Sequence, residues 1–342
     1  MLFFIHYPSW LNPEIIPGLP FRWYGVMYMV AFLLTYVLFR KQVKEKNIEI
    51  SDDSITNLFF WGILGVLIGG RIFSTLVYDQ TGKYWMNPLL IFWPFDSNFN
   101  FTGLQGMSYH GGLLGVIVSV VLYCRKMKLK TLEIGDMIVA AAPLGYTFGR
   151  LGNFINGELF GRVTSSKIGM IFPQAPPFPL KEGWVMETAL RAGFDISSIG
   201  SFINLPRHAS QLYEALFEGI FLWAFLWFFL RRKKLPAGTL LGAYIAGYGF
   251  VRFFIEYFRE PDHDIGFVLT LSGKPGPIYR LDSLFNITMG QILCFLMIAG
   301  GSLFIYYLFK SEKNKTTEEE AREIKHKKGL KELRKAQRRN AK

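Results

Sequence analysis

The chain has 342 residues, of which 51% are hydrophobic, and its formal net charge is +12 at pH 7. The length alone would suit about two soluble domains. Several windows of about 20 residues hold almost no charge, which is enough to cross a hydrocarbon core and argues against that organisation. The two cysteines, Cys124 and Cys294, have no CxxC or His-rich neighbour, which argues against a metal site and a disulfide framework.

Hydropathy predicts an all-α integral membrane protein with about seven transmembrane helices. The apolar runs are continuous rather than alternating, which favours helices over a β-barrel. In chain order the expected spans cover residues 22–40, 55–77, 110–125, 132–150, 209–230, 237–257 and 284–309. The N-terminus has no basic stretch before a short apolar core, so we expect the first span to stay as an uncleaved anchor.

Basic clusters follow every second predicted span. They are RKQVKEK after the first span, RKMKLK after the third, RRKK after the fifth, and a charged tail after the seventh. With seven spans all four clusters lie on one side, which the positive-inside rule makes cytoplasmic. The N-terminus is therefore predicted outside and the C-terminus in the cytoplasm.

The predicted domain organisation is a polytopic domain over residues 1–309 and a basic cytoplasmic tail over residues 310–342. Residues 163–207 begin with a Pro-rich stretch, and a loop of this length predicts a small periplasmic subdomain. The tail holds 13 Lys or Arg and six Glu, which supplies +7 of the net charge of +12. Beside a hydrophobic segment, such a tail suits a solvated extension or anionic lipid headgroups better than nucleic acid.

The predicted topology brings polar side chains from five spans to the outer half of the membrane, where odd spans begin and even spans end. These residues are Tyr24, His110, Arg150, Asn153, Asn156, Glu158, His208, Gln211, Glu214, Arg252 and Glu256. Charged side chains at membrane depth usually face the interior of a bundle or a polar cavity. We therefore expect a polar site on the outer side.

Tyr248, Arg252 and Glu256 recur every four residues, which places them on one face of a helix. Arg252 and Glu256 are expected to pair. Their presence is compatible with a functional cavity. It is equally compatible with a structural ion pair between helices, or with an arginine side chain that extends to the lipid headgroups.

His110 lies in the sequence MSYHGGLLG, in which two glycines follow it directly. These glycines permit close approach of another backbone or of a ligand. An imidazole can take a proton from a thiol or hydroxyl near neutral pH, although a single histidine on an apolar helix is more often structural. The chain has no serine or cysteine in the context of an enzyme nucleophile, so we expect any nucleophile to come with a substrate.

Arg150 and Arg252 are expected at a similar depth, and guanidinium groups bind phosphate through paired hydrogen bonds. In a membrane the commonest phosphate belongs to a lipid. The residue types thus indicate a polytopic protein that binds a phospholipid headgroup. They leave open a transporter and a lipid-modifying enzyme.

The stretch GRLGNFINGELFGR, residues 149–162, carries a resemblance to a known family. It matches the signature G-R-x-G-N-F-x-N-x-E-x-x-G of the prolipoprotein diacylglyceryl transferases at every fixed position. RWYGVMY, YHGGLLG and GYGFVRFFIEYFREPD are similar to further motifs of that family, and the resemblance covers nearly all of the chain up to Lys310. RHASQLYE departs from the usual R-H-P-S-Q-L-Y-E at Ala209.

The resemblance implies a transfer of diacylglyceryl from phosphatidylglycerol to the lipobox cysteine of a prolipoprotein signal peptide. The products would be a thioether and glycerol 1-phosphate, formed in the bacterial inner membrane at a site facing the outer leaflet. The implied partners are phosphatidylglycerol, lipobox signal peptides and membrane lipids, with no metal, cofactor or nucleic acid. The alternatives are another phospholipid-headgroup transferase and a lipid transporter.

The resemblance also implies roles for individual residues of this chain. It places catalytic functions on His110, Arg150 and Arg252, with His110 as the base or as a phosphate ligand. It places substrate binding on Tyr24, Asn153, Asn156, Glu158, Gly161, Tyr248 and Glu256.

Overall fold

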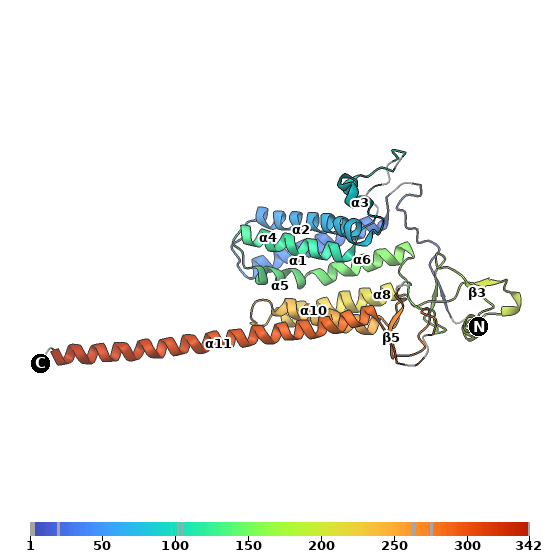
Figure 1. Ribbon diagram of the computed structural model, residues 1–342. Helices are drawn as coiled ribbons and strands as arrows, with labels where there is room; N and C mark the ends of the chain where they lie inside the picture. Colours follow the sequence, from blue (N-terminus) through green and yellow to red (C-terminus); the bar gives the residue numbers. More distant parts are fainter. Residues whose placement is uncertain are drawn as a thin grey trace. The chain divides into compact units, whose positions relative to one another are not determined.

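The computed structural model describes residues 4–18, 21–96, 98–100, 103, 106–261, 265–271, 273 and 276–340, and the side chains up to residue 314. The side chains of the expected tail beyond residue 314, and parts of the outer segments near 78–109 and 258–283, lie outside the described residues. The described chain is mostly helical, as Figure 1 shows, which agrees with the predicted class.

The elements alternate between long helices and short connecting pieces. The α-helices are α1 (Trp23–Glu45), α2 (Asp52–Phe73), α3 (Lys83–Met86), α4 (Tyr109–Lys126), α5 (Thr131–Val139), α6 (Ala142–Asn156), α7 (Gly183–Arg191), α8 (Ser210–Glu214), α9 (Leu222–Ala224), α10 (Thr239–Ile255) and α11 (Met289–Asn340). The π-helical segments are η1 (Ser74–Tyr78), η4 (Ala215–Phe221) and η5 (Phe225–Leu230). The 3-10 segments are η2 (Pro88–Phe92) and η3 (Ile196–Ser198).

Three two-stranded sheets occur in the described connecting segments. Strand β1 (Ile5–His6) pairs in parallel with β2 (Met170–Ile171). Strand β3 (Phe178–Pro179) pairs antiparallel with β4 (Phe202–Ile203). Strand β5 (Phe267–Thr270) pairs antiparallel with β6 (Asn286–Thr288), with a register shift between Phe267 and Leu269.

Four described segments are long and apolar enough to cross a membrane: Trp23–Glu45, Asp52–Tyr78, Ser210–Leu230 and Met289–Asn314. Helix α10 is apolar but shorter. Many large apolar side chains of these helices are exposed, such as Leu33, Phe60, Phe229, Phe254 and Leu303. A bilayer would cover such side chains, so these features are those of an integral membrane protein. The count of seven spans stays a prediction.

The segment predicted as one span over residues 132–150 has a different form. It contains two helices, because α5 ends at Val139 and α6 begins at Ala142. Pro143 lies in the first turn of α6, where its missing N–H costs no helical hydrogen bond. Helix α6 then continues past Arg150 and ends at Asn156, since Gly157 adopts the left-handed conformation with φ 66°. Arg150 and Asn153 are therefore helical residues.

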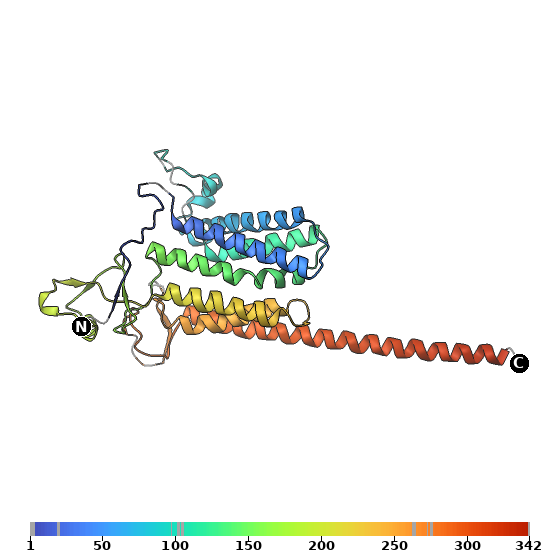
Figure 2. The same cartoon turned by 180° about the vertical axis from the view of Figure 1, so that it is seen from behind.

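The described chain divides into two compact units. One comprises residues 1–35 and 138–342 and contains α6, the continuous helical segment Ser210–Leu230, α10 and α11. The other comprises residues 36–137 and contains α2 and α4. Within the first unit α10 runs along α11, as Figures 1 and 2 show from opposite sides.

In the second unit, α2 packs closely on α4 through glycines. A Cβ atom added to Gly65 would lie 2.6 Å from the carbonyl oxygen of Gly115, and one added to Gly69 would lie 2.9 Å from the Cα of Gly115. Such distances are too short for any real side chain. Small residues allow membrane helices to approach this closely, and the resulting van der Waals contacts hold the pair together.

Residues 163–207 form a small core in the first unit, together with a later loop. Its buried members are Val163, Phe178, Val185, Ala189, Ile203 and Leu205. Tyr279 stacks on Trp184 at a centroid distance of 6.0 Å. The buried cluster joins this segment to Tyr279, and the periplasmic subdomain over residues 163–207 stays a prediction.

Candidate active site

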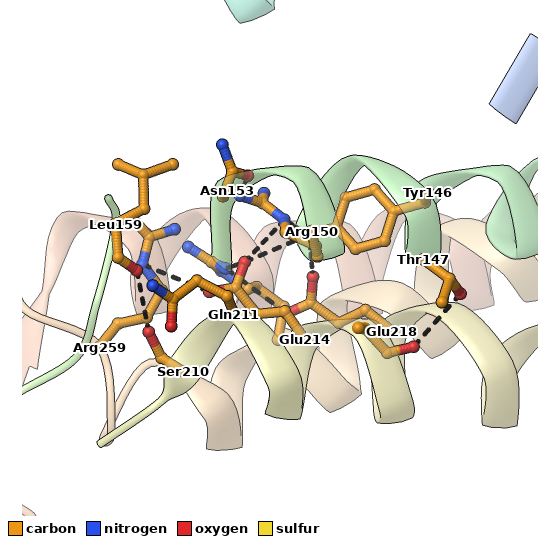
Figure 3. Close-up of polar contacts among 12 residues, drawn as sticks. Tyr146, Thr147, Arg150, Asn153, Leu159, Ser210, Gln211, Glu214, Glu218 and Arg259 are labelled. Carbon is orange, nitrogen blue, oxygen red and sulfur yellow. Dashed lines mark hydrogen bonds and ion pairs between the residues drawn. The ribbon is translucent and has the colours of Figure 1, made fainter. Parts of the chain in front are cut away.

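Helix α6 presents three polar side chains on one face, because Tyr146, Arg150 and Asn153 are spaced by one helical turn. Arg150 Nε donates to the hydroxyl of Tyr146 at 2.6 Å. Arg150 Nη1 donates to Asn153 Oδ1 at 3.3 Å. The guanidinium group is thereby held along its own helix (Figure 3).

Glu214, at the end of α8, is the centre of the ion-pair network. Its carboxylate lies 2.9 Å from Arg150 Nε, 3.1 Å from Arg252 Nη1 and 3.9 Å from Arg259 Nε. The Glu214 side chain is 1% exposed. One buried carboxylate thus pairs with arginines from α6, from α10 and from the segment after α10, and Figure 3 shows it facing Arg150 across the two helices.

Glu218 lies one turn further along the same helical face. It accepts a hydrogen bond from the Tyr146 hydroxyl at 2.5 Å and pairs with Arg252 Nη1 at 3.4 Å. Its side chain is fully buried. Tyr146 therefore links Arg150 to Glu218, and Glu218 links that pair to Arg252.

The expected pairing of Arg252 with Glu256 is confirmed, with Arg252 Nη2 at 3.1 Å from Glu256 Oε2. Glu256 also accepts a hydrogen bond from Thr288 Oγ1 at 3.1 Å. The ring of Tyr248 packs edge-on against that of Tyr146 at a centroid distance of 6.1 Å. The face formed by Tyr248, Arg252 and Glu256 thus points into the network.

The formal charges of this network cancel. It contains three guanidinium groups, those of Arg150, Arg252 and Arg259, and three carboxylates from Glu214, Glu218 and Glu256. The two arginines predicted from the sequence favoured a bound anion, and the carboxylates that compensate their charge were not predicted. Among the described residues, Arg150 Nη2 has no hydrogen-bond acceptor, so it remains available to another anion.

A second part of the site lies where α6 ends. Glu158 Oε1 accepts hydrogen bonds from Asn153 Nδ2 at 2.9 Å and from Asn156 Nδ2 at 3.3 Å. Tyr24, Asn156 and Glu158 line one open depression of about 630 Å³. The expected convergence of these three residues is therefore seen in the structure.

The loop after α6 is fastened to the start of α8. Gln211 Nε2 donates to the carbonyl of Glu158 at 2.6 Å, and Ser210 Oγ donates to that of Leu159 at 3.1 Å (Figure 3). Gly161 bonds through its N–H to the carbonyl of His208 at 2.8 Å. A Cβ atom at Gly161 would collide with the backbone of Phe258, so this signature glycine serves close packing of three backbone segments.

His208 precedes α8 and packs on Phe258 at a centroid distance of 5.1 Å. Its Nδ1 lies 3.2 Å from the Tyr213 hydroxyl. Burial disfavours the charged imidazolium and lowers the pKa of His208 to about 4. His208 is therefore neutral near physiological pH.

His110 belongs to the unit of residues 36–137 and lies in the first turn of α4, as expected. Ser108 caps that helix by accepting from the N–H of Gly111 at 3.2 Å. His110 is exposed, and its Nδ1 lies 2.8 Å from the Tyr78 hydroxyl. The close approach predicted at the following glycines is made by the backbone of α2, which a Cβ at Gly111 would strike at Gly69.

Several members of the network were not predicted from the sequence. They are Tyr146, Glu218 and Arg259, while Glu214 was expected only as a polar residue at the start of a span. The available signal was spacing: Glu214 and Glu218 are four residues apart in an apolar helix, and so are Tyr146 and Arg150.

Comparisons with known proteins agree with the quoted motifs. The family model for prolipoprotein diacylglyceryl transferase matches residues 13–307. A phosphatidylglycerol–prolipoprotein diacylglyceryl transferase from Treponema denticola is 51% identical over 92% of this chain and 97% of its own length. Proteins of the same name from Treponema pallidum and Borreliella burgdorferi are 49% and 42% identical, over 87% and 88% of this chain and 93% of their own lengths.

Proposed function

The chain belongs to the prolipoprotein diacylglyceryl transferase family, and from that premise we propose which residues carry out each part of its reaction. The enzyme transfers diacylglyceryl from phosphatidylglycerol to a prolipoprotein. The observation that supports our assignment best is the connection of Glu158, Asn153, Arg150, Glu214 and Arg252 in one hydrogen-bonded and ion-paired network.

The proposed acceptor is the thiol of the lipobox cysteine in a signal peptide. Its sulfur attacks the glycerol carbon that carries the phosphate ester, so a C–S bond forms as the C–O bond breaks. The bonding electrons leave with glycerol 1-phosphate, and the thiol proton passes to a base. The thiolate is the reactive form, and an ordinary cysteine is largely protonated near neutral pH, so a base is needed.

Arg150 and Arg252 are the proposed ligands of the phosphate. Their side chains are 16% and 13% exposed, so part of each guanidinium group can contact a phosphate while other nitrogen atoms stay paired with carboxylates. Guanidinium groups form short, charge-assisted hydrogen bonds to phosphate. Stabilising the charge that develops on the leaving group is worth about 3–4 kcal/mol per donor in enzymes where it has been measured.

Glu214, Glu218 and Glu256 serve in this proposal to position the arginines. Because the formal charges of the network already cancel and its carboxylates are buried, its charges are oriented before a donor lipid binds. Preorganised charges need no rearrangement during the reaction, which is the main advantage of a protein site over water. Tyr248 and Glu256 set the position of Arg252, and Tyr146 sets that of Arg150.

His110 is the proposed base, on the strength of its chemistry and its family motif. As a base it needs the tautomer in which Nδ1–H donates to the Tyr78 hydroxyl, which leaves Nε2 to accept the thiol proton. Tyr24, Asn153, Asn156 and Glu158 are the proposed ligands of the headgroup, because they line or border the depression at the end of α6.

The proposed topology has seven spans in the bacterial inner membrane, with the N-terminus outside and the active site facing the outer leaflet. Residues 163–207 would then be periplasmic, and the tail from residue 310 cytoplasmic. Support comes from the basic clusters, since the described helices that end at Glu45, Lys126 and Leu230 each carry or adjoin one of them.

The decisive experiment is a reconstituted transfer. Purified enzyme would be mixed with phosphatidylglycerol and a lipobox peptide, and the products analysed by mass spectrometry. We expect the mass of one diacylglyceryl group on the peptide cysteine, equimolar glycerol 1-phosphate, and no modification of a Cys→Ser peptide. Absence of diacylglyceryl on the cysteine would refute the proposed acceptor.

A further inference from the structure

A polar pocket of about 300 Å³ lies beside the start of α1. It is lined by Asn12, Pro13, Glu14, Arg22, Asn156 and Glu158. Only the last two of these residues have a role in the function proposed above. The pocket therefore adds three side chains from the N-terminal segment, those of Asn12, Glu14 and Arg22, to the end of α6.

The N-terminal segment is held at this pocket by its own hydrogen bonds. The N–H of Trp23 donates to the carbonyl of Pro13 at 3.0 Å, and Glu14 and Arg22 form an antiparallel bridge. The N–H of Glu14 donates to Asn12 Oδ1 at 2.9 Å, and Glu14 Oε2 accepts from the N–H of Gly18 at 2.8 Å. The chain thus folds back on itself immediately before α1, and these hydrogen bonds fix the backbone that carries Asn12, Glu14 and Arg22 at the pocket.

The charges of the pocket indicate what it can bind. Two carboxylates, Glu14 and Glu158, face one guanidinium group, Arg22, so the lining disfavours a phosphate. Arg22 also disfavours a simple ammonium group. The lining mixes N–H donors with carboxylate and amide acceptors, and Asn156 Oδ1 is a buried acceptor without a partner among the described residues. A hydroxyl both donates and accepts, so a neutral polyol satisfies such a set best.

A larger depression adjoins this pocket and shares Arg22, Asn156 and Glu158 with it. Its further lining is largely apolar and consists of Ile15, Phe21, Tyr24, Gly25, Val26 and Met29. The combined hollow therefore has a polar end and an apolar side. An amphiphile with a hydroxyl-bearing headgroup matches this division.

The polar pocket is connected to Arg150 through Asn153. Asn153 donates to Glu158 at 2.9 Å and accepts from Arg150 at 3.3 Å. Arg150 and Asn153 are three residues apart on α6, which corresponds to a rise of about 4.5 Å along the helix. A ligand whose phosphate reaches Arg150 can thus extend a short polyol group toward Glu158.

We propose that Asn12, Glu14 and Arg22 complete, with Asn156 and Glu158, a diol-binding subsite that selects the free glycerol of the phosphatidylglycerol headgroup. This inference rests on the proposed function, because it identifies the part of the donor lipid that the pocket binds. Asn12, Glu14 and Arg22 act in it as specificity-determining residues.

The test compares two donor lipids. Phosphatidylglycerol and phosphatidylpropanol carry the same phosphodiester, but only the first has the two headgroup hydroxyls. We expect wild-type enzyme to prefer phosphatidylglycerol by at least about tenfold in kcat/KM, because missing hydroxyls leave pocket groups unpaired. Glu14→Ala and Asn12→Ala should each bring this ratio close to one by lowering activity on phosphatidylglycerol alone.

The activity on phosphatidylpropanol serves as the folding control, since it should be the same in both variants and in wild-type enzyme. Glu49→Ala removes an exposed glutamate in the other unit and should keep the wild-type ratio. An unchanged ratio in both pocket variants would overturn the inference, and so would an equal loss of activity on both lipids.

The outcomes also separate this inference from the proposed function. If wild-type enzyme modified the peptide from neither lipid, the proposed acceptor chemistry would fail. If wild-type enzyme used both lipids equally well, the transfer would stand and the diol subsite would be refuted.

Discussion

The proposed reactive side chains lie in two regions that hold them by different forces. Arg150 and Arg252 belong to a buried network of three guanidinium groups and three carboxylates. His110 is exposed in the first turn of α4, and Tyr78 is its one side-chain hydrogen-bond partner among the described residues. The backbone beside it is fixed, because Gly111 packs against α2.

Each arrangement suits the proposed task of its side chains. Charges that must hold an anion are oriented in advance by surrounding charges, so that little rearrangement is needed when the anion arrives. A base must instead be accessible to the substrate and must not be held in an ion pair. Only the backbone that carries it needs to be fixed. Ion pairs therefore position Arg150 and Arg252 in the first region, and backbone packing positions His110 in the second.

The largest effect is expected from Arg150→Ala. The variant removes a proposed phosphate ligand and leaves Glu214 without its nearest partner, so transfer should fall by about 10³-fold or more. The buried network would then hold three carboxylates and only two guanidinium groups, those of Arg252 and Arg259, and this uncompensated charge should also cost about 3 kcal/mol of stability. Transfer is measured by mass spectrometry and stability by thermal unfolding in detergent.

A matched control is Arg191→Ala, which removes an exposed arginine paired with Glu187. It should retain activity and stability. Normal transfer by Arg150→Ala would contradict the proposed phosphate clamp and, with it, the contrast between the two regions.

His110→Gln should lower kcat by about 10²-fold, because general-base catalysis is lost. The KM for phosphatidylglycerol and the unfolding temperature should stay unchanged, since the side chain is exposed and bonds only to Tyr78 among the described residues. Steady-state kinetics with both substrates measure this. A raised KM with unchanged kcat would identify His110 as a lipid ligand instead of a base.

Gly111→Ala tests whether packing fixes the second region. The new Cβ would collide with the backbone of Gly69, so we expect a loss of about 2 kcal/mol in stability. Gly300→Ala is the matched control, because no atom lies within 4 Å of its added Cβ. Equal unfolding temperatures for the two variants would show that α2 and α4 separate without cost.

Tyr146→Phe removes the hydroxyl that joins Arg150 to Glu218. We expect kcat to fall by about tenfold, because Arg150 loses one of its positioning contacts while its pairing with Glu214 remains. Tyr306→Phe, at an exposed position of α11, serves as the control. If KM rose and kcat did not change, the hydroxyl would be binding substrate instead of positioning Arg150.

The smallest effect concerns His208, whose pKa of about 4 lies below the ordinary value near 6.5. The unfolded chain therefore binds more protons between these values, so stability is highest above pH 6.5 and falls as the pH is lowered toward 4. From pH 7 to pH 6 the loss should be about 0.7 kcal/mol. His208→Asn should flatten this dependence, and an unchanged slope would show that other groups cause it.

Several features of the site were predictable from local patterns. The positions of Tyr24 and His110 in the first turns of α1 and α4 follow from the onset of apolar runs. The pairing of Arg252 with Glu256 follows from their spacing of four residues. These predictions succeeded because each depends on a single helix and its period.

Other features depended on contacts between distant segments. Glu218 and Tyr146 lie on different helices, and only the packing of α6 against Ser210–Leu230 makes them partners. The junction of Gly161 with the backbone of Phe258 likewise joins segments that are far apart in the chain, and substrate binding by Gly161 stays a prediction. The break between α5 and α6 was missed because the apolar run continues across it, through Val139, Ala140 and Ala141.

The helical membrane class, the family and the residues that carry polar chemistry all follow from local patterns in the sequence. Hydropathy and helical period are properties of a short stretch of chain, so they can be read without knowing the neighbours. The charges that compensate one another around Glu214, and the residues that line the pocket beside α1, are known only from the tertiary structure. Pairing energies depend on distance and burial, and both are set only when separate helices pack together.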